Sequence, residues 1–109
     1  MRANREVPLN GDAMSRRRFL VTYDICDEKR LRNVFKVMNN YGDHIQYSVF
    51  LCELNAMERV RLETSLGKSI NHREDQILFF DLGPISIEVE TTIASMGKGF
   101  QPRCRTMIV

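Results

Sequence analysis

The sequence lacks most of the features that mark secreted, membrane or disulfide-stabilised proteins. No apolar run approaches the roughly 18 residues that a membrane helix needs, and the N-terminal arginines are followed by no apolar segment before Phe19, so we expect no secretory signal. Cys26, Cys52 and Cys104 lie far apart and form no CxxC pair, which argues against a disulfide framework or a zinc knuckle. We therefore expect a protein of the reducing cytoplasm, without a membrane span.

The sequence also lacks the common catalytic motifs. It has no HExxH, no Walker loop, no GxGxxG and no nucleophile elbow. His44 and His72 do not have metal-ligand spacing, so each is best interpreted as a surface or capping histidine. Asp81, in "FFDLG", is best interpreted as a turn residue. These absences leave few places where chemistry could occur.

The length of 109 residues predicts one domain. Residues 1–15 have no hydrophobic period and contain Pro8 and Gly11, so we expect a flexible N-terminal extension followed by a single domain over 16–109. Met14 begins a more typical opening, "MSRRRFLVTYD". The thirteen residues before it are interpreted as either an extension from an upstream start or a remnant of cloning.

Strand and helix patterns alternate along the domain. They predict strands over 17–25, 44–54 and 75–83, strand composition over 85–97, and a short last strand over 104–109. A first helix is capped by Asp27, buries Leu31, Val34, Phe35 and Met38, and ends at Gly42. A second begins with a capping box, Asn55 and Glu58, and buries Leu62, Leu66 and Ile70, with Met57 and Val60 beside them. We expect an α+β, ferredoxin-like (βαββαβ-type) sandwich, with two helices on one face of a mostly antiparallel sheet and an extra C-terminal strand.

The alternation of side chains in the first strand separates two faces. Phe19, Val21 and Tyr23 form the more apolar set and are expected under the helices. Leu20, Thr22 and Asp24 take the other face, and the phase of 44–54 puts Gln46, Ser48 and Phe50 there too. This face looks too apolar for solvent and too polar for a core. We therefore expect it to be a surface for self-association.

Asp24 is an unusual end for a short apolar strand. A carboxylate there could hold a hard divalent cation such as magnesium, which can activate water at a scissile phosphate. One acid is too little for a metal site, but a two-fold dimer would supply a second copy of Asp24. The alternative is that Asp24 caps the following turn, and the residues alone favour that alternative.

Cations are concentrated near Asp24, although the net charge of the chain is only +2. Between residues 16 and 36 there are three acids and seven cations, which are Arg16, Arg17, Arg18, Lys29, Arg30, Arg32 and Lys36. A local basic surface can bind phosphates. The alternative, a solvated helix face, is the more common explanation of such a run.

The stretch from Leu20 to Leu54 resembles the opening half of the Cas-two family of small CRISPR-associated adaptation proteins. The matching elements, in order, are Tyr23-Asp24-Ile25, Lys29-Arg30-Leu31-Arg32, Tyr41-Gly42, Gln46 and Ser48-Val49-Phe50. Weaker similarity continues through 75–83 to the C-terminal end, so the resemblance covers residues 16–109. Each motif is short, but their order and spacing together are specific.

This resemblance implies a ferredoxin-like homodimer whose sheets face one another, with Asp24 as the catalytic, Mg²⁺-binding acid at the interface. It implies metal-dependent cleavage of RNA or DNA phosphodiesters in some members. It also implies a CRISPR integrase as partner, in a spacer-acquisition complex that holds DNA. Arg30 and Arg32 match positions near the active cleft, and Tyr23, Ser48 and Phe50 belong to the motifs beside it. The terminal "TMIV" resembles the strand that adds to the partner protomer's sheet.

Three functions are then compared. The first is a nuclease in which an Asp24 pair holds magnesium. The second is a non-catalytic DNA-binding adaptor, which presents Arg16, Arg17, Arg18, Arg30 and Arg32 to the duplex backbone and bridges integrase subunits. We favour the adaptor as the biological role and the nuclease as a latent one. A regulatory domain that binds a small metabolite is the least favoured, because the chain has no Gly-rich ligand loop and its first helix is basic.

Overall fold

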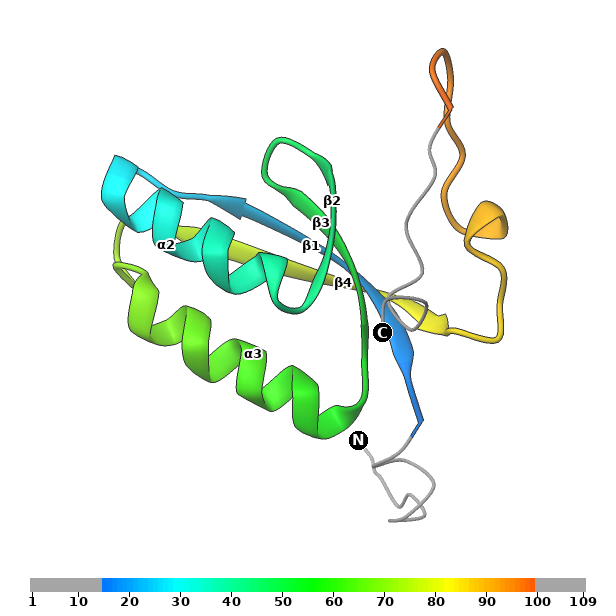
Figure 1. The fold of residues 1–109 in the computed structure, drawn as a ribbon, viewed down its shortest axis with the longest axis horizontal. Coiled ribbons are helices and arrows are strands. Elements are labelled where there is room, and N and C mark those ends of the chain that lie inside the picture. The colour runs from blue at the N-terminus through cyan, green and yellow to red at the C-terminus, as the bar shows by residue number, and fades with distance from the viewer. Residues whose placement is uncertain (1–14, 100–109) are drawn as a thin grey trace.

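Two helices cover one face of a four-stranded antiparallel sheet (Figure 1). The computed structural model describes residues 15–99, so the expected N-terminal extension, apart from Ser15, and the expected strand over 104–109 lie outside the described residues. The elements are β1 (Arg17–Asp24), α2 (Glu28–Asn39), β2 (Gly42–Gln46), β3 (Val49–Leu54), α3 (Ala56–Ser69), β4 (Gln76–Pro84) and the 3₁₀ helix η1 (Val89–Thr91). The sheet order β2-β3-β1-β4 confirms the expected ferredoxin-like arrangement.

Both helices begin where their capping residues predict. The Asp27 side chain accepts a hydrogen bond from the Arg30 backbone N–H, and Asn55 and Glu58 form the expected capping box. These bonds satisfy backbone donors that the first helical turn leaves without partners. The end of α2 differs from the prediction, because the helix is closed by Asn40 and Gly42 already belongs to β2.

Gly42 has a packing role. A Cβ placed on it would lie 2.4 Å from the Cys52 Sγ and 2.7 Å from the Leu51 carbonyl oxygen. Gly42 and Cys52 are paired across β2 and β3, so the absence of a side chain lets the two strands approach beside a buried sulfur. This close approach is the reason for glycine at the position.

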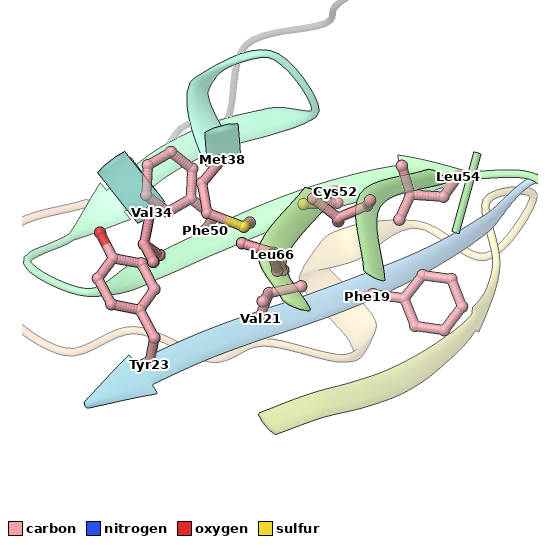
Figure 2. Close-up of a cluster of buried hydrophobic side chains, with 10 residues drawn as sticks. Phe19, Val21, Tyr23, Val34, Met38, Phe50, Cys52, Leu54 and Leu66 are labelled. Carbon is pink, nitrogen blue, oxygen red and sulfur yellow. The ribbon is translucent and has the colours of Figure 1, made fainter. Parts of the chain in front are cut away.

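The core lies between the helices and one face of the sheet (Figure 2). Val34 and Met38 of α2 and Leu62 of α3 are completely buried there, and Leu66 is nearly so. The predicted helix faces were too wide. Leu31 and Phe35 at the rim of α2 remain about one-third exposed, and Met57 and Val60 of α3 are more than half exposed.

The prediction of one strand over 44–54 was wrong. The segment is a hairpin, in which Tyr47 and Ser48 form the turn between β2 and β3 and an irregularity in pairing lies between His44 and Gln46. The turn and the irregularity reverse the alternation. Phe50 is therefore completely buried in the core with Cys52, and not on the helix-free face where the sequence placed it.

The segment after β4 is not the strand that its composition suggests. Between Ile85 and Gly99 the structure has turns and the short helix η1. Residues 93–96, Lys98 and Gly99 line a cleft of about 740 Å³ together with Leu20, Thr22 and Val49 of the helix-free face. Figure 1 shows this segment, in yellow and orange, on the side of the sheet away from α2 and α3.

Candidate functional site

Asp24 is the last residue of β1 and is exposed. It pairs in register with Gln76 of β4 and lies on the same face of β1 as Leu20 and Thr22. Among residues 15–99, its carboxylate takes part in none of the observed side-chain hydrogen bonds or ion pairs. Asp24 is therefore a solvent-facing carboxylate at the corner of the helix-free face.

The capping role considered for Asp24 is performed by other acids. Asp75 accepts the Cys26 backbone N–H at 2.9 Å, and Asp27 accepts the Arg30 backbone N–H at 3.0 Å. These two carboxylates satisfy the turn between β1 and α2. The capping alternative thus finds no support in the described part of the chain.

The motif residues expected beside Asp24 do gather at this end of β1. The Tyr23 backbone N–H donates to the Ser48 carbonyl at 3.1 Å, and the Tyr23 ring stacks on Phe50 with centroids 6.2 Å apart. Figure 2 shows both rings near the arrowhead of β1. Burial raises the pKa of the Tyr23 phenol, and a side-chain hydrogen bond with Ser48 opposes that rise. Tyr23 and Phe50 hold the end of β1 from the core side of the sheet, while Asp24 faces solvent on the helix-free side.

A buried carboxylate that the sequence did not single out lies behind this corner. Asp75 has a side chain with no exposed surface, and it forms an ion pair with the Arg30 Nε at 2.8 Å. It also accepts the backbone N–H groups of Cys26 and Asn71. The hydrogen bonds from Arg30 above all, and then those two backbone donors, hold the pKa of the Asp75 carboxyl well below its ordinary value. The sequence indicated this role only weakly, because Asp75 has the pattern of an ordinary polar residue at the start of a strand.

The structure pairs four of the five arginines that were expected to bind nucleic acid. Arg16 forms a bidentate contact with Glu58, and the Arg17 Nε–H is shared between the two carboxylate oxygens of Asp81. Arg18 reaches Glu53 at 3.4 Å and the Ile87 carbonyl at 2.6 Å. Arg30 contacts Asp75 and Glu74. Arg32 is exposed, and no ion pair found among residues 15–99 includes it. A role in nucleic-acid binding stays a prediction for all five.

Three exposed cations without such pairs lie on α2. Lys29, Arg32 and Lys36 are spaced three and four residues apart, so they follow one stripe of the helix. Within the described residues none of the three takes part in an observed ion pair. This stripe therefore differs from Arg16, Arg17 and Arg18, whose side chains contact acids.

The helix-free face carries exposed apolar side chains. Leu20 is partly exposed, and its register partner Phe80 and the nearby Leu78 of β4 are 47% and 42% exposed. They share this face with Thr22 and Asp24 because paired residues of antiparallel strands lie on the same side. The acid thus borders a surface on which apolar side chains are exposed.

A single chain does not form a metal centre in the described region. Residues 15–99 contain no group of three or more His, Cys, Asp or Glu side chains that could hold an ion. His44 stacks on Phe50 and contacts the Tyr47 carbonyl, and His72 contacts the Gly67 carbonyl at 2.9 Å. Both thus have structural contacts, as expected.

None of the described helices is long and apolar enough to cross a membrane.

The fold and this corner define a small ferredoxin-like domain with one exposed acid at the end of its first strand and a sheet face that carries no helix of the α2–α3 layer. The family model of CRISPR associated protein Cas2 matches residues 17–88. The chain belongs to the Cas2 family, as its sequence motifs indicated. The match includes β1, the hairpin, both helices and β4.

Relatives and solved structures agree with this assignment. The chain is 36% identical over 91 residues to a protein named CRISPR-associated endoribonuclease Cas2 from Geobacter sulfurreducens, covering 84% of this chain and 95% of the relative. It is 41% identical over 83 residues to a protein of the same name from Rhodospirillum rubrum, covering 76% and 80%. The crystal structure of Streptococcus pyogenes Cas2 matches with a TM-score of 0.64 and 34% identity, covering 73% of this chain and 99% of that one.

Proposed function

We propose that this chain is a metal-dependent endonuclease that acts on phosphodiester bonds of RNA or DNA, with Asp24 as its catalytic acid. The observation that carries the proposal is the exposed Asp24 carboxylate, which has no role in capping or pairing within the described structure. Acids that serve folding are usually bonded, as Asp75 is here. The names of the relatives, which call them endoribonucleases, support the same reaction class.

The active form we propose is a homodimer joined through the helix-free faces. Leu78 and Phe80 on that face are apolar and exposed, and they lie on the same strand pair as Asp24. A two-fold axis through this face brings identical patches together. It would also bring the two copies of Asp24 toward each other, which provides the second carboxylate that one chain lacks.

The proposed cofactor is Mg²⁺. Asp24 offers the hard carboxylate oxygens that this ion prefers, and one or two carboxylates with retained waters are a usual protein set for it. The Asp24 side chains of the two protomers would hold the ion at the interface. When bound, magnesium would activate water and stabilise the leaving oxygen. The chain's own contribution is to hold the two acids at the edge of the substrate surface.

The test compares two matched substitutions in the same segment. Asp24→Asn should abolish Mg²⁺-dependent cleavage of single-stranded RNA and of duplex DNA, because it removes the charge that attracts the metal. Asp27→Asn makes the same chemical change three residues away, and asparagine caps helices as well as aspartate. Its cleavage rate should stay close to wild type. Undiminished cleavage by Asp24→Asn would remove this residue from the mechanism.

A second function, a DNA-binding adaptor for the CRISPR integrase, is favoured by the stripe of Lys29, Arg32 and Lys36. Cations that do not pair with acids of the protein are available to bind phosphate oxygens. Such contacts hold the nucleic acid without distinguishing its base sequence. In this role the dimer would hold duplex DNA and bridge integrase subunits. If Asp24→Asn abolishes cleavage while spacer acquisition survives in cells, the adaptor is the biological role.

The stripe can be tested separately from catalysis. Replacing both Arg32 and Lys36 by alanine should weaken DNA binding alike for all sequences and reduce the salt slope by about one per lost contact. Lys98→Ala, which removes a cation near the cleft on the other side of the sheet, is the control. An unchanged salt slope for the double variant would exclude the stripe as the phosphate contact.

A further inference from the structure

The segment that follows Asp24 is held by one buried carboxylate from a distant part of the sequence. Residues 25–27 belong to neither β1 nor α2. Within them, the Cys26 backbone N–H donates to Asp75 Oδ1 at 2.9 Å and the Cys26 thiol donates to the Glu74 carbonyl at 3.0 Å. The short connection that follows Asp24 is thereby attached to the loop between α3 and β4.

Both oxygens of Asp75 are fully used. Oδ1 accepts from Cys26 and from the Arg30 Nη2 at 3.2 Å. Oδ2 accepts from the Arg30 Nε at 2.8 Å and from the Asn71 backbone N–H at 2.8 Å. Arg30 lies in the first turn of α2, so one carboxylate joins the end of β1, the start of α2 and the loop before β4. Charge-assisted bonds in a planar, forked pair restrict direction as well as distance.

Arg30 is committed to this network. Its guanidinium binds both oxygens of Asp75 and also Glu74 at 3.1 Å. Removing it would leave the Asp75 charge buried without its cation, which is strongly unfavourable. Its contacts are those of a counter-charge for Asp75, whereas Arg32, two residues on, remains exposed.

We propose that Asp75, with Arg30 as its counter-charge, is a positioning residue that sets where the Asp24 carboxylate lies. This inference rests on the proposed nuclease function and adds to it a residue that touches neither metal nor substrate. A displacement of a reacting group by about 1 Å can cost about a hundredfold in rate. Asp75 therefore controls the rate of cleavage without itself contacting the substrate.

The kinetic test measures kcat and KM for Mg²⁺-dependent cleavage in wild type and in Asp75→Asn. The control is Asp81→Asn, since Asp81 also pairs with an arginine and accepts a backbone N–H, but at the other end of the β1–β4 pair. We expect Asp75→Asn to lower kcat by about tenfold to a hundredfold with KM nearly unchanged, as supporting residues of active sites do. Asp81→Asn should leave both close to wild type.

A second readout covers the case in which Asp75→Asn folds poorly. Arg30→Gln removes only the counter-charge and leaves Asp75 in place, and amide hydrogen exchange at residues 24–27 reports the attachment directly. We expect faster exchange there in both variants, while the centres of β1 and β3 keep their protection. Arg30→Lys, which keeps the charge but loses the fork, should recover part of kcat.

The outcomes separate the two proposals. If Asp24→Asn cleaves as fast as wild type, Asp24 is not part of the mechanism, and Asp75 then has no catalytic carboxylate to position. If cleavage depends on Asp24 but folded Asp75→Asn and Arg30→Gln keep the wild-type kcat, the positioning role is wrong and the network serves folding alone. Exchange at residues 24–27 that is unchanged in both variants would overturn the proposal as well.

Discussion

Phe80 offers the sharpest test of the proposed dimer surface. It is 47% exposed on the helix-free face, opposite Leu20. A buried phenylalanine covers about 200 Å², so covering the exposed part would remove roughly 90 Å² of apolar surface from water. At about 25 cal/mol per Å² this stabilises the dimer by about 2 kcal/mol per protomer. Two-fold symmetry counts each residue twice, so Phe80→Asp should cost on the order of 4 kcal/mol, or about a thousandfold in the dissociation constant.

Sedimentation equilibrium over a concentration series would measure this change. The matched control is Val60→Asp, because Val60 is apolar and 60% exposed but lies on α3, on the opposite side of the sheet. Circular dichroism would establish that both variants are folded. We expect the control to dimerise like wild type and Phe80→Asp to sediment as a monomer with no Asp24-dependent cleavage. Equal dissociation constants for the two variants would refute the assignment of the helix-free face as the interface.

Two further predictions concern stability. Gly42→Ala should lower the free energy of unfolding by about 1–3 kcal/mol in urea titrations, because its Cβ would overlap the Cys52 sulfur and the Leu51 carbonyl. The double variant Gly42→Ala/Cys52→Ala should recover only part of the lost stability, because the overlap with the Leu51 carbonyl remains. A urea midpoint of Gly42→Ala equal to that of wild type would contradict this packing. The lowered pKa of Asp75 means that its contribution to stability is complete above the ordinary carboxyl pKa of about 4 and is lost as the pH falls through the lower, folded-state value. Urea titrations at decreasing pH should therefore show a steeper loss for wild type than for Asp75→Asn, and parallel curves would contradict the role of Arg30.

Local signals in the sequence were enough for the starts of both helices and for strands β1 and β4. Asp27 and the Asn55–Glu58 pair cap helices through bonds within four residues, so their chemistry can be read from spacing alone. The strand alternation of β1 was predicted correctly for the same reason. Tyr23 and Asp24 point to opposite faces because neighbouring residues of a strand must do so.

The hairpin was missed because its turn lacks the usual residues. The turn consists of Tyr47 and Ser48, and the serine marks a turn more weakly than glycine, asparagine or proline do. Without that mark the alternation seemed to continue, and Phe50 was assigned to the wrong face. A change of one residue in phase moves every later side chain to the other side of a sheet.

Ion pairs between residues far apart in the sequence could not be predicted, for a different reason. Arg16 lies 42 residues from its partner Glu58 and Arg30 lies 45 from Asp75, so charge counts near Asp24 could not show which cations are occupied. The same holds for the segment over 85–97. Strand composition becomes a strand only when the segment pairs with a neighbouring strand, and in the described residues this segment pairs with none.

The single carboxylate on each chain has a consequence for mixed populations of subunits. A site that needs Asp24 from both protomers is shared equally, so a subunit without the acid inactivates every intact subunit with which it assembles. In a cell that makes both forms, and where the two exchange freely, cleavage would fall as the square of the intact fraction. A variant of this one residue would thus behave as a dominant inhibitor, whereas a variant that disrupts the helix-free face would be silent beside a normal copy.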